Sequence, residues 1–279
     1  MTEQWTTQDA ARTLRRPTAS DDKYSRGVLG VRTGSDRYPG AAVLGVEAAH
    51  RTGVGMVRYV GPERATAFVL SRRPETVAAD GRVQAWLIGS GTDAAERSAD
   101  ETAALRALFA GEVPVVVDAG ALDLVPGRSG TAPVVVTPHA SEHARLREAA
   151  GLDASAADRA EAAADTAAAL GVAVLLKGAE TIVATPSRAI RRVESPTAWL
   201  ATAGTGDVLG GILGALVAAA QPKDAEALAP LAATAALVHG HAGAAASAAR
   251  DGGPITALDV AEAAASVIGR ILAQADGAH

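Results

Sequence analysis

Short apolar runs rich in valine, isoleucine and leucine alternate along this chain with longer, alanine-rich segments of helical character. Val113–Val117 and Val172–Leu176 are almost continuously apolar, which indicates strands buried on both faces of a sheet. Strands that alternate with helices favour a parallel, doubly wound arrangement. We therefore expect an α/β fold with a central, mostly parallel sheet and helices on both of its faces.

The same pattern assigns the individual elements and the domain organisation. Strands are expected within residues 27–35, 55–62, 85–91, 113–122, 132–138 and 172–178, with helices over 40–53, 94–110, 140–151 and 156–171. A hairpin is expected over 180–194, and the tail from 207 to 275 should be mostly helical. We find no repeat and no linker, so residues 23–279 are expected to form a single domain after a polar N-terminal extension over residues 1–22.

Composition and charge exclude several classes of protein. The 279 residues carry a formal net charge of −5, which disfavours a nucleic-acid binder with a basic stripe. The absence of cysteine excludes disulfides, cysteine-based zinc sites and thiol catalysis. The N-terminus has no signal-peptide pattern, and the apolar run Val208–Ala220 is too short to span a bilayer. We expect a soluble, cytoplasmic protein without nucleic-acid or membrane partners.

Residues of chemical interest follow the expected strands. They are Gly91, Asp118, His139, Lys177 and the turn before Asp207. Ligands of open α/β sheets bind beyond the carboxyl ends of the strands. Any one of these turns alone is most simply structural, but five that converge on one sheet edge predict a ligand site there.

The stretch GTGD, residues 204–207, lies directly before the apolar helix. Its glycines allow a tight turn whose N–H groups approach an anion, and a helix N-terminus favours negative charge. Asp207 has two interpretations. As a helix N-cap it would contribute about 0.5–2 kcal/mol. As a carboxylate that stays ionised at neutral pH, it would accept a hydroxyl proton during phosphoryl transfer.

Several segments together resemble one family. ATAGTGDVLGGILGAL resembles the GTGD/GSGD signature of the ribokinase-like superfamily, in which the aspartate is the catalytic base and the turn is an anion hole. YPGAAVLGVEAAHRTGVGMV, LIGSG, VVVDAGAL, VVVTPHASEHARL and VLLKGAETIVATP resemble, in the same order, the sequence blocks of the NAD(P)H-hydrate dehydratases. The resemblance extends from about Lys23 to Ala273 and implies a ribokinase-like fold.

The resemblance also implies an activity. The family removes water from the (6S)-hydrates of NADH and NADPH (NADHX and NADPHX), with ADP as phosphoryl donor and Mg²⁺ as cofactor, and releases AMP and phosphate. It further implies a homo-oligomer, by analogy a tetramer. Only about 22 residues precede the first matched block, so we expect the epimerase of hydrated cofactors to be a separate protein. Two alternatives stay open: a vitamin-precursor kinase of the same fold, and a nucleotide-binding module without activity.

Site residues follow from the resemblance by position. Asp207 would be the catalytic base, and the anion hole would consist of Gly204, Thr205 and Gly206. The nucleotide would be bound by Lys177, Gly178, Ala179, Glu180, Thr181 and Gly206. The substrate would be bound by Gly40, Ala41, Ala42, Gly91, His139 and Asp207. Glu142 would organise the Mg²⁺ through water.

Other roles for these residues remain open, and the chain departs from the family at a few positions. Lys177 is also explained as a solvated lysine at a strand end, His139 as an exposed loop residue, and Glu142 as an acid that complements a helix dipole. Where the family usually has GPGLG and DADAL, this chain has GSGTD and DAGAL, so the departures are Ser90, Thr92, Asp93 and Gly120. Gly120 replaces an acid, and we do not expect the remaining Asp118 to be catalytic.

The histidine pair His239 and His241 invites interpretation as a metal site. Residues at positions i and i+2 do not face the same side of a helix. We therefore expect the two histidines to have packing or surface roles.

Overall fold

The computed structural model describes residues 2–156 and 158–276. Within them, a nine-stranded sheet has the order β1-β9-β8-β7-β6-β5-β4-β2-β3. Its strands are β1 (Thr2–Gln4), β2 (Val28–Arg32), β3 (Met56–Tyr59), β4 (Ala85–Ile88), β5 (Val115–Val117), β6 (Val134–Val136), β7 (Ala173–Leu176), β8 (Glu180–Ala184) and β9 (Ile190–Glu194). Only the pairings of β8 with β7 and β9 are antiparallel. The expected mostly parallel sheet and the expected hairpin are both confirmed.

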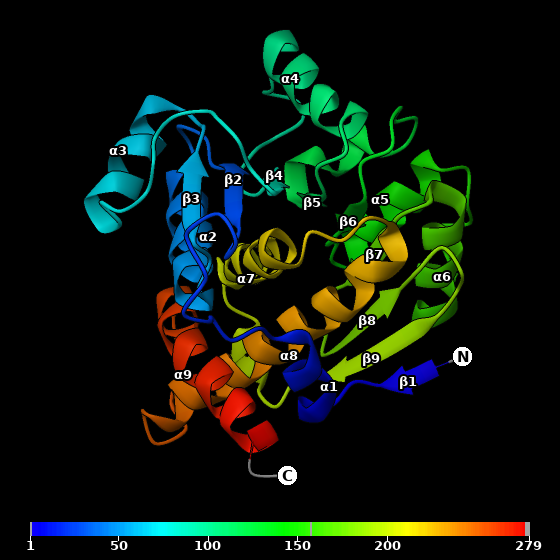
Figure 1. Cartoon of the computed structure of the whole chain (residues 1–279). Helices are drawn as coiled ribbons and strands as arrows, with labels where there is room; N and C mark the ends of the chain where they lie inside the picture. Colours follow the sequence, from blue (N-terminus) through cyan, green and yellow to red (C-terminus); the bar gives the residue numbers. More distant parts are fainter. Residues whose placement is uncertain (1, 157, 277–279) are drawn as a thin grey trace.

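Helices connect the strands and follow the sheet. They are α1 (Thr7–Thr13), α2 (Pro39–Thr52), α3 (Glu63–Arg72), α4 (Ala99–Ala110), α5 (Ala140–Ala149), α6 (Arg159–Leu170), α7 (Thr205–Ala220), α8 (Ala225–Ala248) and α9 (Ala257–Asp276), with short 3-10 turns η1 (Ala119–Leu124) and η2 (Ala198–Leu200). The helical tail is confirmed. Figure 1 shows α7 and α8 on one side of the sheet, with α5 and α6 on the other.

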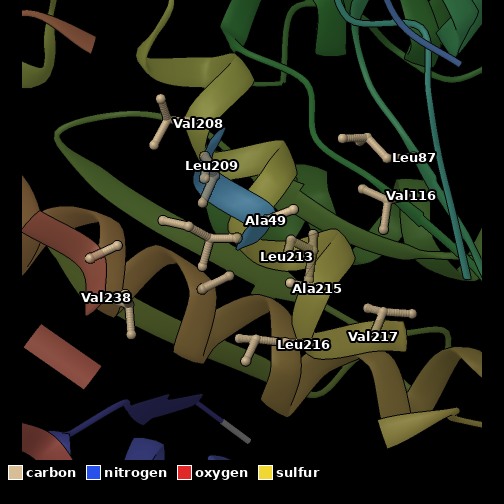
Figure 2. Packing of buried hydrophobic residues seen from close by; sticks show 14 of the residues in the cluster. Ala49, Leu87, Val116, Val208, Leu209, Leu213, Ala215, Leu216, Val217 and Val238 are labelled. Atoms are coloured by element: carbon tan, nitrogen blue, oxygen red, sulfur yellow. The ribbon is translucent and has the colours of Figure 1, made fainter. Parts of the chain in front are cut away.

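Two hydrophobic cores lie on opposite faces of the sheet because side chains alternate along each strand. In β5, Val116 belongs to the core under α2, α7, α8 and α9, whereas Val115 and Val117 belong to the core under α4, α5 and α6. Figure 2 shows Val208, Leu209, Leu213 and Val217 of α7 packed in the first core. This double burial explains why the strands are almost continuously apolar.

The segment expected to be a polar extension, residues 1–22, contains two elements of the described fold. β1 pairs in parallel with β9 at the sheet edge, and α1 contacts α8 and α9 (Figure 1). The indole N–H of Trp5 donates a hydrogen bond to Thr234 Oγ1 at 3.2 Å. An edge strand pairs through its backbone, so the polar side chains of β1 did not indicate that this segment is a strand. The division of the chain at residue 22 stays a prediction.

The length and hydropathy of the helices are also relevant to the expected location of the protein. Among residues 2–156 and 158–276, no helix combines the length and the hydropathy that a membrane span requires. The cytoplasmic location stays a prediction.

Candidate active site

The glycine-rich turn lies at the N-terminus of α7. Gly204 is the N-cap, with φ of +88°, and a Cβ at this position would lie 2.6 Å from Leu44 Cδ1, so only glycine fits. The Thr205 hydroxyl contacts the carbonyl oxygens of Leu200 and Thr202 at 2.8 and 2.9 Å, and the Thr205 amide donates to Thr202 at 3.3 Å. In the described chain the amides of Gly204 and Gly206 have no backbone acceptor. These two amides are free for an anion.

Asp207 is the third residue of α7. Because Gly204 occupies the N-cap position, the N-cap interpretation of Asp207 is wrong. Burial raises the pKa of Asp207 to about 7; the charge of Asp118 acts in the same direction, and Lys177 opposes both. The expectation of an ordinary, low pKa for this carboxylate is therefore not supported, since burial and Asp118 shift its titration towards neutral pH. Neither burial nor a second carboxylate was visible in the local sequence.

Lys177 follows β7 and meets the turn. Its Nζ lies 2.9 Å from Asp118 Oδ1 and 3.9 Å from Glu142 Oε2. A Cβ on Gly206 would lie 3.6 Å from Nζ, so the ammonium stands beside the first turn of α7. Burial by itself would lower the pKa of Lys177, but the carboxylates of Asp118 and Glu142 outweigh it and the pKa is raised. Lys177 is thus a fixed positive charge at an anion site.

Asp118 follows β5 and is buried, with 3% of its surface exposed. Oδ1 also accepts a hydrogen bond from Thr137 Oγ1 at 2.8 Å, and Oδ2 accepts one from Ser90 Oγ at 2.9 Å. Ser90, Asp118 and Thr137 follow the adjacent strands β4, β5 and β6. The parallel sheet therefore brings these residues to one edge.

His139 and Glu142 form a capping box at the start of α5. His139 Nδ1 accepts hydrogen bonds from the amides of Ser141 and Glu142, and the His139 amide donates to Glu142 Oε2 at 2.8 Å. His139 Nε2 lies 3.4 Å from Glu142 Oε1. The helix-start interpretation of Glu142 therefore holds, and the two residues line two different cavities, His139 the first and Glu142 the second.

The first of these cavities has a volume of about 600 Å³. It is lined by residues from β8, β9, η2, α7 and α8 and from the segments before α5 and after β7, among them His139, Lys177, Thr181, Gly206 and His239. A second cavity of about 540 Å³ is lined by Tyr38, Gly120 and Glu142. Asp207 lines neither cavity, whereas its neighbours Thr205 and Gly206 line the first. The anion site therefore opens into a space large enough for a nucleoside.

The structure brings together most of the residues expected to bind the nucleotide. The first cavity is lined by Lys177, Gly178, Ala179, Thr181, Thr205 and Gly206. Glu180 does not line it, and its carboxylate accepts a hydrogen bond from the Arg192 guanidinium.

The residues expected to bind the substrate fall into two groups. His139 lines the first cavity, but Gly40, Ala41, Ala42 and Gly91 do not. Gly91 has φ of +66°, and a Cβ there would lie 2.4 Å from Ala41 Cβ. Ala42 is completely buried, whereas Gly40 faces open space. Of these four residues, Gly40 is the most accessible to a ligand.

Two residues of the site had no role assigned from the sequence. Asp118 was expected at the ligand edge of the sheet but not as a catalytic residue, and it is the hydrogen-bond partner of Lys177. His239 lines the first cavity, and its Nε2 has no hydrogen-bond partner among the residues that the structure describes; burial lowers its pKa to about 4, so the ring is neutral. His241 is exposed, and residues 2–156 and 158–276 contain no His/Asp/Glu cluster that could hold a metal. The apolar run Leu231–Val238 before His239 was the available signal for its burial.

A mostly parallel sheet with this turn, lysine and acid at its carboxyl edge defines the ribokinase-like class of α/β proteins. A ribokinase-like superfamily protein of Enterococcus faecalis V583 has the same fold, with a TM-score of 0.83 over 97% of this chain and 96% of that one at 20% identity. The family model of NAD(P)H-hydrate dehydratase matches residues 29–265. The chain belongs to the NAD(P)H-hydrate dehydratase family.

Individual relatives agree with this assignment. The bifunctional NAD(P)H-hydrate repair enzyme Nnr of Mycobacterium tuberculosis H37Rv is 46% identical over 219 residues, which are 74% of this chain and 44% of Nnr. The chain thus spans less than half the length of that relative. The ADP-dependent (S)-NAD(P)H-hydrate dehydratase of Neisseria meningitidis serogroup B is 35% identical over 72% of each chain. The ADP/ATP-dependent NAD(P)H-hydrate dehydratase of Bacillus subtilis, co-crystallised with ATP/Mg²⁺, superposes with a TM-score of 0.84 at 25% identity, over 96% of this chain and 98% of that one.

Proposed function

We propose that the chain catalyses the ADP-dependent dehydration of the (6S)-hydrate of NADH or NADPH. The products are AMP, phosphate and the restored cofactor, so the enzyme is a hydro-lyase that repairs nicotinamide cofactors. One observation carries this proposal: the free amides at the start of α7, the Lys177 ammonium and the Asp207 carboxylate meet beside a cavity of about 600 Å³. The names of the Neisseria and Bacillus relatives support the substrate and the donor.

The nucleotide is bound by positive charge and amides. The phosphates lie against Lys177 and the amides of Gly204 and Gly206, where the helix N-terminus also favours negative charge. The nucleoside extends into the first cavity past Gly178 and Thr181. This places the donor phosphoryl group beside Asp207.

The reaction then proceeds in two steps. Asp207 takes the proton from the ring hydroxyl, whose oxygen forms a bond to the β-phosphorus of ADP while the bond from that phosphorus to the oxygen of AMP breaks. The phosphate ester is a better leaving group than hydroxide. The ring nitrogen lone pair expels phosphate, and loss of a proton from the adjacent ring carbon restores the double bond. A base with a pKa of about 7 suits the first step, because it is partly ionised and still basic at neutral pH.

Mg²⁺ fits this site as a cation that arrives with the nucleotide. The charges of Asp118, Glu142 and Asp207 all act on the Lys177 ammonium, so the site needs additional positive charge to accept a diphosphate. Mg²⁺ typically binds through one or two carboxylates, waters and phosphate oxygens, which agrees with the absence of a larger ligand cluster among the described residues. Glu142, through water, is the residue that would hold it, and the ion would neutralise phosphate charge.

The proposal also covers the partners and the location of the protein. We propose that the chain forms a homo-oligomer, by family analogy a tetramer, and acts in the cytoplasm with a separate epimerase. The bifunctional mycobacterial relative supports the link with an epimerase. Light scattering after gel filtration measures the oligomeric state, and a monomer across the micromolar range would contradict the tetramer.

The direct experiment supplies hydrated NADH, Mg²⁺ and ADP and follows the return of the NADH absorbance band. We expect recovery that depends on ADP. If hydrated NADH is not restored with ADP or ATP, and ATP instead phosphorylates another alcohol to a stable product, the chain is a kinase. If no turnover occurs while ADP binds, it is a nucleotide-binding module.

The matched variant is Asp207→Asn, which keeps the shape of the side chain and removes the base. We expect turnover to fall by at least about a hundredfold, while the Kd for ADP changes by less than about threefold. Asp251→Asn is the control, since Asp251 is exposed and its φ of +54° suits asparagine. Unchanged turnover in Asp207→Asn would remove this residue from the mechanism.

A further inference from the structure

The Asp118 carboxylate accepts three hydrogen bonds behind the anion site. Ser90 Oγ, Thr137 Oγ1 and Lys177 Nζ lie 2.9, 2.8 and 2.9 Å from it. The donors lie just after β4, β6 and β7, which flank β5 on both sides. A buried carboxylate with three donors has a fixed orientation, so it holds whatever it binds in one place.

Asp118 and Asp207 compete for the same ammonium. Lys177 forms ion pairs with Asp118 and Glu142, and within residues 2–156 and 158–276 it forms none with Asp207. The charge of Asp207 nevertheless acts on Lys177, and no donor in the described chain hydrogen-bonds to the Asp207 carboxylate. An ammonium paired directly with Asp207 would stabilise its ionised form and weaken it as a base.

Building on the function proposed above, we propose that Asp118 is a positioning residue that holds the Lys177 ammonium at the phosphate site and away from Asp207. Ser90 fixes the orientation of the Asp118 carboxylate for this task. The Ser90 hydroxyl is thus one of three donors that clamp the carboxylate holding the phosphate-binding lysine.

Asp118→Asn tests the claim without a change of shape. The amide oxygen still accepts hydrogen bonds, but the charge that retains Lys177 is gone, so the ammonium is expected to pair with Asp207. We expect kcat to fall by at least about tenfold, and the Kd for ADP to rise by a smaller factor because the ammonium leaves the phosphate site. A loss of ADP affinity in proportion to kcat, together with a lower Tm, would instead indicate a structural role and overturn the proposal.

Ser90→Ala tests the clamp. It removes one of three hydrogen bonds, so we expect a loss of about two- to fivefold in kcat at unchanged Kd for ADP. Ser187→Ala is the matched control: Ser187 Oγ donates to Glu226 Oε2 at 2.9 Å, the same chemistry far from the site, and kcat should not change. Equal rates for Ser90→Ala and wild type would exclude the clamp.

A double-variant cycle separates positioning from packing. If Asp118 acts through Lys177, adding Asp118→Asn to the Lys177→Met variant should lower kcat by no more than about twofold. A tenfold fall in kcat when Asp118→Asn is added to Lys177→Met would overturn the proposal.

A crystal structure of Asp118→Asn tests the positioning role independently of whether the proposed substrate is the right one. We expect Lys177 Nζ within hydrogen-bond distance of the Asp207 carboxylate. An ammonium that stays at position 118 overturns the positioning role, whereas failure of wild-type dehydration overturns the proposed function alone.

Discussion

Gly211 in α7 packs against the backbone oxygen of Gly45 in α2. A Cβ on Gly211 would lie 2.2 Å from this oxygen and 2.9 Å from Ala48 Cβ. Both helices begin at the carboxyl edge of the sheet, where α7 carries Asp207 and α2 carries Gly40 (Figure 1). The close approach of the two backbones therefore sets the distance between the turn at 204–207 and the expected substrate region.

Gly211→Ala is expected to destabilise the protein although alanine favours helices. The methyl group forces α7 away from α2, and overpacking of this kind costs about 1–3 kcal/mol. Urea denaturation measures the free energy of unfolding. Gly269→Ala in α9 is the control, because a Cβ there meets nothing within 4 Å and should stabilise by up to about 1 kcal/mol. Equal stability of Gly211→Ala and wild type would show that α7 and α2 can move apart without a loss in the free energy of unfolding.

The sequence predicts the fold because its signals are local. Alternation of apolar strands with alanine-rich helices is enough for the mostly parallel sheet, and the glycines after Asp207 indicate a close partner for α7. The partner itself, α2, is not predictable from these glycines, since more than 150 residues separate Gly45 from Gly211. The pairing of β1 also escapes prediction, because it depends on backbone groups.

The candidate site also has parts that the sequence predicts and parts that it does not. Lys177 and the turn at 204–206 lie in continuous motifs, so their meeting follows from the strand order of the sheet. The role of Asp118 does not, because its hydrogen bonds come from Ser90, Thr137 and Lys177, which follow three other strands. The raised pKa of Asp207 was not predictable for the same reason, since it depends on burial and on Asp118.

Glu47→Gln is expected to lower the free energy of unfolding. Glu47 in α2 is completely buried and is hydrogen-bonded by Arg51, Arg72 and Arg73. Breaking a buried ion pair costs about 3–5 kcal/mol; these arginines are partly exposed, so we expect about 2–3 kcal/mol at pH 7. Glu75→Gln, which removes only an exposed pair with Arg73, should cost less than about 1 kcal/mol.

The effect of Glu47 should also depend on pH. Burial alone would raise its pKa, but the three arginines lower it from 4.5 to about 2. A lowered native pKa stabilises the fold above the unfolded value and is lost on acidification. The difference between wild type and Glu47→Gln should therefore be full above pH 4.5 and shrink as the pH falls towards 2. A difference that stays constant down to pH 2 would contradict the ion-pair explanation.

Gly206→Ala is expected to weaken nucleotide binding and leave the fold intact. The new Cβ would lie 3.6 Å from Lys177 Nζ, an ordinary contact, so nothing in the protein must move. It would, however, occupy space beside the ammonium and the free amides, where the phosphate belongs. We expect the Kd for ADP to rise by at least about tenfold, measured by calorimetry, with Tm unchanged or slightly higher. Unchanged ADP affinity would place the phosphates elsewhere.

The pH dependence of turnover should follow Asp207. Its pKa is about 7 because it is buried and near Asp118, and the carboxylate must be ionised to accept the hydroxyl proton. We therefore expect kcat/KM to rise with pH to a plateau above about 7 and to fall about tenfold per pH unit below it. His239 does not produce this limb, since its pKa is about 4. Asp118→Asn removes a charge that raises the Asp207 pKa, so the midpoint should move to lower pH while Asp251→Asn keeps the wild-type profile. A wild-type profile that stays flat from pH 8 to pH 5 would mean that the group accepting the proton is not Asp207.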